Sequence, residues 1–409
     1  MAILELDVNL TEEQRTLRDE ARRFLMEVWR PAAIKLDALA TAEEVIAEDS
    51  ILWDVLRQTY KLGYHKRSFP QEYGGLGLND PIAGALISEE MGYAAPDLAI
   101  SLGVCSFPFT IAMMSPHPDL QNLVRQYCED EEAKLRGCWA ITEPEHGSDW
   151  ILFEGESSEN PKCAPQLTAR LVGDEYVLNG QKSAWVSNGT IATHAALFLG
   201  IEPVRGMRTC GVAVVPLDLP GVSRGKPLDK LGQRALNQGE IFFDDVHIPK
   251  EYMVVSDPEV YNMTISAILG GANAGMGTLF AGTARSALDE AIAYSKERVQ
   301  GGRRIIEHQS VQGRLFDMFI QVEAARSLNR RVVAYNAQAG TALQYSIASK
   351  ILSTETSFRV ASMAMQIFGG YGLTKDFVIE KIFRDARASM IEDGVNETLA
   401  LAGAIRLVQ

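Results

Sequence analysis

Apolar residues recur at helical spacing through the first third of the chain. Thr11 is a suitable helix N-cap because Glu12 and Glu13 follow it in the first turn, and apolar residues then repeat every three or four positions to about Val28. From there to about Arg125 the pattern predicts further helices, interrupted by the segments FPQEYGGLGLNDP and SPHPDL. Residues 1–134 are therefore expected to form a helical domain.

The pattern changes near Leu135. Short runs rich in β-branched and aromatic residues follow, separated by Gly, Asn, Asp and Pro, among them AALFLGIEP, GVAVVPLD and GEIFFDDVHIP. Helical periodicity returns after about Glu251, in ARSALDEAIAYSKERV and SVQGRLFDMFIQVEAARSLNRRVVAYNAQ. The sequence predicts an α+β protein: helices over 1–134, a small β-barrel or sheet over 135–250, and a four-helix bundle over 251–409.

Length and charge narrow the range of functions. The 409 residues carry a formal net charge of −14, which argues against nucleic acid or an anionic membrane surface as the main partner. The segment MAILELDVNLTEEQRTLRDEARRF has early acidic residues, and no uncharged apolar stretch reaches spanning length, so a cytoplasmic protein without a membrane span is expected. The 5 cysteines are widely spaced without a CxxC pair, which predicts buried thiols and no metal site.

Five sequence blocks occur in order between about residue 70 and residue 397. They are FPQEYGGLG (69–77), AITEPEHGSD (140–149), NGQKSAWVSNG (179–189), KLGQRALNQGEIFFDDVHIP (230–249) and QIFGGYGLTKDFVIEKIFRDARASMIEDGVNE (366–397). Together, these blocks resemble the acyl-CoA dehydrogenase family. The resemblance implies an acyl-CoA substrate, FAD bound non-covalently between the β domain and the bundle, a homotetramer or a dimer, and an electron-transfer flavoprotein as electron acceptor.

The second and third blocks suit the polar edge of a flavin ring. Thr142 and Ser148 flank a turn that contains Pro and Gly and precedes a β segment, and such a turn presents hydroxyl and backbone N–H groups. The alternatives are an ordinary solvent-exposed turn and, for Trp185, an ordinary core residue. By resemblance, Ser148 also borders the thioester, and the flavin contacts are Trp139, Ile141, Thr142, Gly147, Ser148, Trp185 and Ser187.

A second group of residues is implied to hold the rest of the dinucleotide. Arg298 and Gln309 lie in RVQGGRRIIEHQ, and the resemblance implies that Arg298 reaches the FAD pyrophosphate of a neighbouring subunit, where a guanidinium suits phosphate oxygens. Gly301 stands where the family usually has Phe, so the chain departs from the family on the adenine side. The other implied FAD contacts are Gln366, Gly369, Gly370, Val395 and Glu397.

The general base is expected at Asp393. The family's base is a Glu before Gly-Thr, and alignment without gaps from Arg384 places Asp393 on it, followed by Gly394 and Val395. A desolvated carboxylate suits this role because the α-proton beside a thioester is only weakly acidic. The Asp side chain is shorter than Glu by roughly 1.5 Å. The substrate therefore lies nearer this loop, or the backbone has moved, or the base lies elsewhere.

Other positions around the base also depart from the family. One branch carries its base on the first helix of the bundle, where this chain has Ala272, and Asn273 follows in place of an Arg. Glu392 replaces a Tyr. Asp97 is the alternative base, in the segment that lines the acyl pocket of this fold, although a helix N-cap also explains it. The expected substrate-binding residues are Ser148, Asn273, Glu392, Asp393, Gly394 and Asp97.

The acyl group is less constrained by the sequence. The segment Ser68–Val124 contains no Lys or Arg, so it offers no cation for a distal carboxylate and disfavours a glutaryl-type substrate. The changes around the base favour a cyclic, branched or aryl-bearing acyl group. We interpret the chain as an FAD-dependent acyl-CoA dehydrogenase that gives an enoyl-CoA, with hydride passing to flavin N5. The alternatives are a flavin oxidase or monooxygenase on the same fold and a non-catalytic acyl-CoA-binding homologue.

Overall fold

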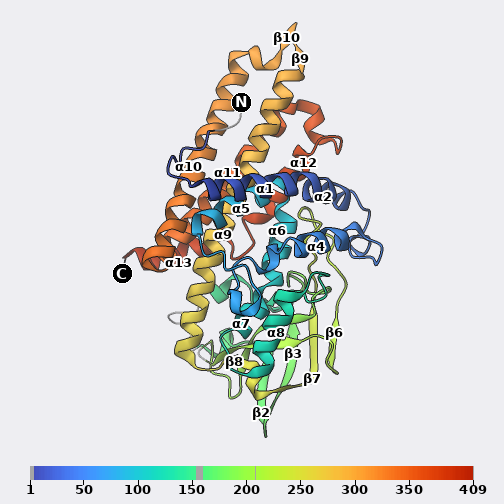
Figure 1. Cartoon of the computed structure of the whole chain (residues 1–409), viewed down its shortest axis with the longest axis vertical. Helices are drawn as coiled ribbons and strands as arrows, with labels where there is room; N and C mark the ends of the chain where they lie inside the picture. Colours follow the sequence, from blue (N-terminus) through green and yellow to red (C-terminus); the bar gives the residue numbers. More distant parts are fainter. Residues whose placement is uncertain (1–3, 153–159, 208, 409) are drawn as a thin grey trace.

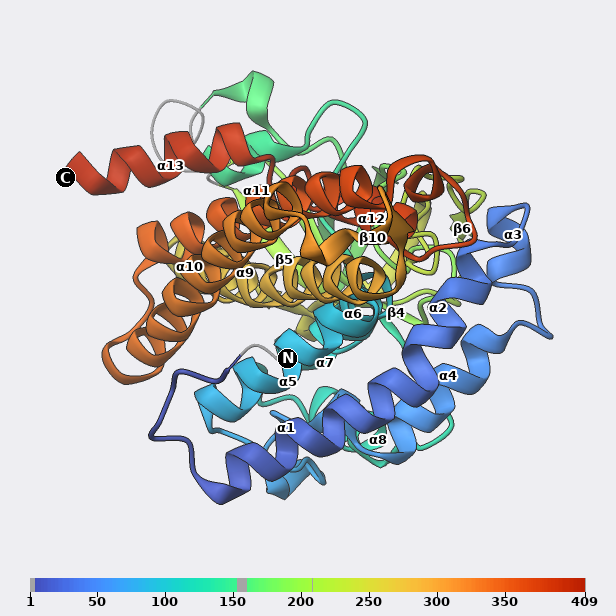
Figure 2. The same ribbon diagram turned by 90° about the horizontal axis from the view of Figure 1, so that it is seen from above.

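The structure is a computed structural model that describes residues 4–152, 160–207 and 209–408. Long helices of the C-terminal part extend from one end of the molecule, and a twisted sheet forms the other end (Figure 1). The N-terminal helices lie along one side of both parts, as the view from above shows (Figure 2). The expected order of helices, sheet and helices is confirmed.

Helix α1 (Glu12–Phe24) begins at the predicted cap. The Thr11 hydroxyl accepts a hydrogen bond from the Gln14 N–H at 3.1 Å, and the Gln14 side chain accepts one from the Thr11 N–H at 2.9 Å. This reciprocal capping box satisfies two N–H groups that would otherwise lack partners. The helix continues through a π-helical turn, η1 (Leu25–Trp29), into α2 (Arg30–Asp37).

The other N-terminal helices follow the predicted interruptions. Asp80 caps α5 by accepting from the N–H groups of Ile82 and Ala83, directly after the glycine-rich segment. Helix α7 packs against strands of the sheet, so the N-terminal helices cover one of its faces. The bounds are α3 (Ala42–Val45), α4 (Ile51–Lys61), α5 (Pro81–Ala94), α6 (Pro96–Cys105), α7 (Phe107–Ala112) and α8 (Pro118–Glu129).

The central sheet has the order β6-β7-β3-β2-β4-β5-β8, with β1 also paired to β4. Pairing is antiparallel except where β1 and β2 run parallel to β4. Along β7, buried positions alternate with more exposed ones on either side of the exposed pair Asp244 and Asp245, so the sheet buries one face in its own apolar core. The strands are β1 (Gly137–Ala140), β2 (Thr168–Val172), β3 (Glu175–Lys182), β4 (His194–Ile201), β5 (Cys210–Pro216), β6 (Val222–Arg224), β7 (Ile241–Pro249) and β8 (Met253–Val255).

The C-terminal helices pack closely on the N-terminal ones. Helix α5 crosses the long helix α9 at two glycines: a Cβ added to Gly92 would lie 1.8 Å from the Leu279 carbonyl oxygen, and one added to Gly282 would lie 2.0 Å from the Glu89 oxygen. Only glycine permits this approach. The bounds are α9 (Pro258–Glu297), α10 (Gln309–Ala339), α11 (Leu343–Phe368), α12 (Ile379–Ser389) and α13 (Asn396–Val408), with the small hairpin β9 (Val299–Gln300) and β10 (Arg303–Arg304) between α9 and α10.

Single helical turns connect the larger elements. They are η2 (Tyr64–Lys66), η3 (Gln71–Tyr73), η4 (Ser148–Leu152), η6 (Pro161–Cys163), η7 (Lys250–Tyr252), η8 (Ile305–Glu307) and η9 (Gly369–Leu373). Two of these turns, η4 and η9, contain residues expected to bind FAD. Across the described ranges, every helix is too short or too polar to cross a bilayer.

Candidate active site

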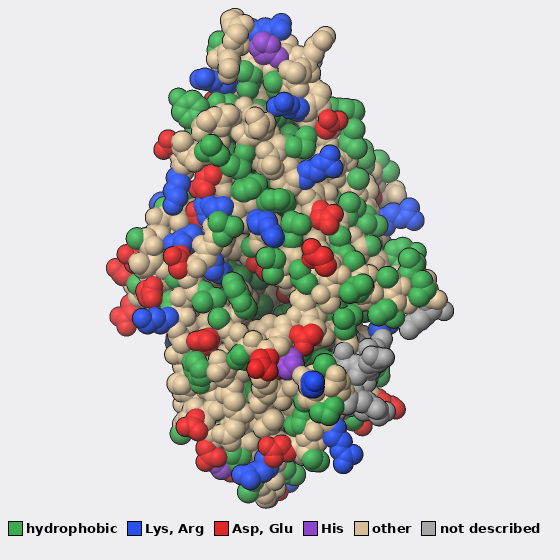
Figure 3. Space-filling view, turned by 180° about the vertical axis from the view of Figure 1, so that it is seen from behind, with side chains coloured by type: hydrophobic (Ala, Val, Ile, Leu, Met, Phe, Trp, Pro, Cys, Tyr) green, Lys and Arg blue, Asp and Glu red, His purple; other side chains and the backbone are tan. Residues whose placement is uncertain are grey.

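A cavity of about 630 Å³ lies where the sheet, helix α9 and the loop after α12 meet. Its wall is mostly apolar and includes Ile100 of α6 and Ile265, Leu269 and Met276 of α9. Figure 3 shows a hollow at the border between the helical part and the sheet, with hydrophobic side chains around it. A cavity of this size and character suits a ligand with an extended apolar part.

All seven residues expected at the flavin ring line this cavity. Two indole groups are notable: the N–H groups of Trp139 and Trp150 are buried and have no hydrogen-bond partner in the described part of the chain. Trp185, by contrast, is 60% exposed, which is unusual for so large an apolar side chain. Unpaired donors beside exposed aromatic surface suit a planar heteroaromatic ring that carries several acceptors, and a flavin has this character.

A buried ion pair fixes the turn that carries Thr142. Lys182 Nζ lies 2.6 Å from Glu143 Oε1, with both side chains fully buried, and it also donates to the Ile141 carbonyl oxygen at 3.1 Å. The Thr142 carbonyl oxygen accepts from the Ser183 N–H at 2.9 Å. The backbone of Ile141 and Thr142 is therefore held rigidly against β3.

The loop that carries Asp393 is tied to both neighbouring domains. The Val395 N–H donates to the Ser148 hydroxyl oxygen at 3.0 Å. From α11, Lys350 Nζ donates to the Gly394 carbonyl oxygen and to Asn396 Oδ1, each at 2.8 Å. Gly394 has φ 98°, and a Cβ added there would lie 2.2 Å from Ile151 Cδ1, so the turn requires glycine.

Asp393 itself has a left-handed backbone with φ 49°. Asp tolerates this conformation better than most residues other than glycine and Asn, so the Asp that this chain has in place of the family's Glu suits the local backbone. The side chain lines the cavity, and in the described ranges no group donates a hydrogen bond to its carboxylate. Burial raises the pKa of Asp393, and the nearby Lys350 charge opposes that rise.

Four further ionisable residues line the same cavity: Asp229, Lys230, Arg387 and Glu392. Burial raises the pKa of Glu392 to about 7. Burial lowers the pKa of Lys230 to about 8, opposed chiefly by the charge of Glu392. Glu392 was expected from the sequence, whereas Lys230 was identified only as part of a sequence block.

Asp97 and Asn273 do not line the cavity. Asp97 is fully buried, and its Oδ2 accepts from Lys381 Nζ at 2.9 Å. The N-cap of α6 is Ala95, so the N-cap explanation for Asp97 is wrong. Asn273 is also fully buried and donates to the Leu269 carbonyl oxygen at 2.8 Å. Both side chains are turned to partners inside the protein.

The residues expected at the pyrophosphate and adenine lie at the far end of the long helices. Arg298 follows α9 and lies over the Tyr371 ring at 5.6 Å, beside the glycine-rich turn η9 that contains Gly369 and Gly370. Gln309 opens α10, and Gln366 lies in the last turn of α11. None of these five residues lines the cavity of its own chain. Glu397 lies in the first turn of α13 and is exposed.

Several residues of the site were not identified from the sequence as candidates. Trp150 lines the cavity, and Lys350 of α11 donates a hydrogen bond to the Gly394 carbonyl oxygen of the Asp393 loop. The signal for Lys350 in the sequence was a charged residue within a largely apolar helix. Trp150 directly follows the predicted flavin turn, and that proximity was its signal. Gln233, which contacts Glu392, is an ordinary polar residue of the fourth block.

Comparison with known proteins agrees with this architecture. Three family models match: the N-terminal domain of acyl-CoA dehydrogenase over residues 11–115, the middle domain over 138–246 and the C-terminal domain over 264–407. The chain is 29% identical over 408 residues to the short-chain specific acyl-CoA dehydrogenase of Clostridium acetobutylicum, covering 98% of this chain and 100% of that protein. It is 30% identical over 398 residues to the acryloyl-CoA reductase (NADH) of Anaerotignum propionicum, covering 96% and 93%.

A solved structure gives the same result. The butyryl-CoA dehydrogenase of Megasphaera elsdenii superimposes with a TM-score of 0.85 at 25% identity, covering 99% of this chain and 100% of that one. The family expected from the five sequence blocks is thus confirmed. The chain belongs to the acyl-CoA dehydrogenase family of FAD-dependent oxidoreductases.

Proposed function

We propose that this protein dehydrogenates the acyl part of a coenzyme A thioester at the α- and β-carbons, with Asp393 as the general base. One observation carries the proposal: the Asp393 carboxylate lines the cavity, is free of hydrogen-bond donors within the described ranges, and lies two residues from the hydrogen bond between Val395 and Ser148. A desolvated carboxylate without donors is a stronger base than one in water.

The same loop offers donors for the thioester oxygen. Neither the Asp393 N–H nor the Gly394 N–H has an acceptor in the described part of the chain, and both residues line the cavity. A thioester oxygen at either group would gain a hydrogen bond that strengthens as negative charge develops on it. Asp393 would then remove the α-proton from a carbon whose carbanion is stabilised.

FAD, when bound, supplies the acceptor for the hydride that leaves the β-carbon. We assign its ring to the cavity wall of Trp139, Ile141, Thr142, Gly147, Ser148, Trp185 and Ser187, where the unpaired Trp139 N–H supports the assignment. We assign Arg298, Gln309, Gln366, Gly369 and Gly370 to the pyrophosphate and adenine of a second copy's FAD, because they lie far from their own cavity. Assembly as a homotetramer and an electron-transfer flavoprotein as acceptor belong to this proposal.

We infer that the acyl group is cyclic, branched or aryl-bearing. Besides the residues assigned to the flavin ring, the cavity is lined by the bulky apolar side chains Ile100 of α6 and Ile265, Leu269 and Met276 of α9, which suit a bulky apolar group. The relatives named above are named for short acyl groups, and the departures from the family at Glu392 and Asp393 are the reason to look beyond straight chains.

Anaerobic titration tests the proposed reaction. Purified protein with bound FAD is mixed with straight, branched, alicyclic and aryl acyl-CoAs, and loss of flavin absorbance is followed in a stopped-flow instrument. At least one acyl-CoA should bleach the flavin, and Asp393→Asn should abolish rapid bleaching while retaining FAD. If no acyl-CoA bleaches the wild-type flavin, the proposal is wrong. Rapid reoxidation by air after bleaching would instead favour an oxidase.

A further inference from the structure

The cavity wall contains a polar site beside the proposed base that the reaction itself does not require. Glu392 is adjacent to Asp393 in the chain and lines the same cavity, together with Lys230. The cavity wall is mostly apolar, with Ile391 and Leu231 as neighbours along the chain, and Asp229 and Arg387 also line it. A carboxyl group and an ammonium group on such a wall are costly unless they are paired.

Glu392 is held firmly by one of its two oxygens. Gln233 Nε2 donates to Glu392 Oε2 at 3.0 Å. Gln233 is fully buried, and its backbone N–H donates to Asp385 Oδ1 at 2.5 Å. Asp385 accepts from Lys381, whose other partner is Asp97. This buried chain of contacts fixes the side chain of Glu392 from behind the cavity wall.

The other oxygen, Oε1, has no hydrogen-bond partner anywhere in the described ranges. Lys230 does not supply one, because its ammonium donates to the Leu236 carbonyl oxygen at 2.7 Å and to Gln238 Oε1 at 2.9 Å. Glu392 is partly buried and lines the cavity, so a ligand group or a water molecule inside the cavity can complete the hydrogen bonding of this oxygen. The unpaired oxygen therefore points to a polar group on the ligand.

The charges of the site limit which group this is. Glu392, Asp393 and Asp229 give the cavity wall negative charges, and Lys230 and Arg387 give it positive ones. A charged group of either sign on the acyl chain would therefore meet like charges. A neutral group avoids both penalties. With its pKa at about 7, Glu392 populates both protonation states near neutral pH, so it can accept from a hydroxyl or donate to a carbonyl oxygen.

We infer that the acyl group carries a neutral oxygen, a hydroxyl or a ketone, which hydrogen-bonds to Glu392 Oε1. This inference rests on the proposed function and specifies its substrate class: an oxygenated acyl-CoA whose oxygen lies beyond the β-carbon. Glu392 thus acts in substrate choice, whereas Asp393 acts in proton removal.

Matched substrate pairs test the inference. The probes are cyclohexanecarboxyl-CoA and its 3-hydroxy, 4-hydroxy and 4-oxo derivatives, and kcat/KM for flavin reduction is measured for each. Wild type should prefer at least one oxygenated probe by about tenfold or more, the ratio that one hydrogen bond gives. Glu392→Leu should lower that preference at least tenfold, and Glu392→Gln, which keeps hydrogen-bonding capacity, should lower it less.

A control variant and a fallback variant keep the outcomes separate. Glu131→Gln, at an exposed glutamate outside the cavity, should retain the wild-type preference. If Glu392→Leu does not fold, the test rests on the kcat/KM ratio of oxygenated to unsubstituted probes, compared between Glu392→Gln and wild type. Wild type that reduces its flavin with unsubstituted cyclohexanecarboxyl-CoA as well as with every oxygenated probe would overturn the inference and leave the dehydrogenase function intact. Failure of all acyl-CoAs would overturn the function itself.

Discussion

The Ser148 hydroxyl accepts a hydrogen bond from the Val395 N–H at 3.0 Å, joining the turn expected at the flavin to the loop of the proposed base. Ser148 comes from η4 at the edge of the β domain, and Val395 precedes α13 in the bundle. The two residues are far apart in the sequence, so this contact sets the distance between Asp393 and the flavin site.

Ser148→Ala should slow flavin reduction without emptying the FAD site. The substitution leaves the Val395 N–H without its acceptor, a loss of about 0.5–1.5 kcal/mol, or roughly tenfold at most in the population of the ordered loop. Ser148→Thr keeps the hydroxyl and should retain more of the rate. Stopped-flow reduction at saturating substrate measures the effect, and equal rates for all three proteins would show that the contact does not position the base.

Asp393→Asn should reduce the rate of flavin bleaching by about 10²–10⁴-fold, because the amide keeps the shape of the side chain but lacks a basic oxygen. Acyl-CoA should still bind and perturb the flavin spectrum. Asp393→Glu should lower the rate with the native substrate, since the added methylene crowds the cavity and Glu is less suited to φ 49°. It should raise the rate with straight-chain acyl-CoAs. A near-normal rate for Asp393→Asn would assign proton removal to another group.

The pH dependence of the reaction should respond to Lys350. Burial raises the pKa of Asp393 and Lys350 opposes the rise, so the base loses activity as pH falls through a pKa above the ordinary value for Asp. Lys350→Met removes the positive charge and should move this acid limb to higher pH. A profile of the reduction rate between pH 5 and 9 tests the shift. A rate that falls equally at every pH would mean that Lys350 only holds the loop through Gly394 and Asn396.

The sequence was most informative where function depends on contiguous residues. The cap at Thr11 was predicted from local pattern, because capping depends on neighbours in the chain. The segments 139–148 and 185–187, read through the family resemblance, also converge on one cavity, because β1 and β3 lead into them. Local spacing carries this information directly.

The sequence was less informative where contacts join distant segments. Lys350 reaches Gly394 from another helix, and Gln233 reaches Glu392 from the β domain, and no spacing in the chain indicates either pairing. Asp97 was expected near the acyl pocket, but the charge of Lys381, 284 residues away, holds its carboxylate inside the protein. Side-chain direction in such cases depends on tertiary charge partners.

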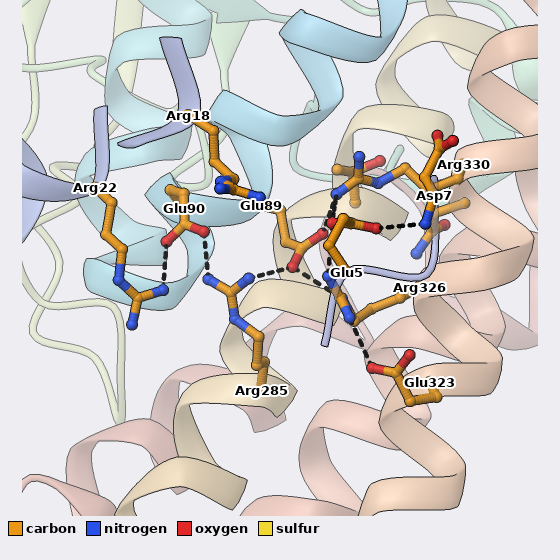
Figure 4. A network of polar contacts seen from close by, with 12 residues as sticks. Glu5, Asp7, Arg18, Arg22, Glu89, Glu90, Arg285, Glu323, Arg326 and Arg330 are labelled. Atoms are coloured by element: carbon orange, nitrogen blue, oxygen red, sulfur yellow. Dashed lines mark hydrogen bonds and ion pairs between the residues drawn. The ribbon is translucent and has the colours of Figure 1, made fainter. Parts of the chain in front are cut away.

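A buried ion network between the N-terminal helices and the bundle gives a prediction for stability. Glu89 of α5 lies 2.9 Å from Arg326 and 2.7 Å from Arg330 of α10, and it also contacts Arg285 of α9 (Figure 4). Burial alone would raise the pKa of Glu89, but the three guanidinium charges lower it from 4.5 to about 2. Because the folded-state pKa is the lower one, the carboxylate stabilises the fold above pH 4.5 and loses this effect as pH falls toward 2.

Glu89→Gln should therefore lower the free energy of unfolding at pH 7 by about 3–5 kcal/mol, because three arginines lose their common anion. The deficit should shrink as pH falls below 4.5. Glu323→Gln is a suitable control, since among the described residues Glu323 pairs only with Arg326, which keeps Glu89. Urea unfolding at several pH values measures both variants, and a deficit that is the same at pH 3 and pH 7 would contradict the electrostatic origin.

Arg298→Ala should weaken FAD retention and subunit association together. Arg298 is exposed at the end of α9, and its guanidinium lies over the Tyr371 ring, far from the cavity of its own chain. If it binds the pyrophosphate of a second copy's FAD, its loss removes charge-assisted hydrogen bonds worth about 1.5–3 kcal/mol at a contact shared by two subunits. Light scattering during dilution, with the flavin-to-protein absorbance ratio, reports both effects. Arg331→Ala, an exposed arginine of α10, should change neither. Full FAD occupancy and unchanged assembly in Arg298→Ala at low protein concentration would contradict the intersubunit role, because an arginine that binds only its own chain's FAD would not couple the two measurements.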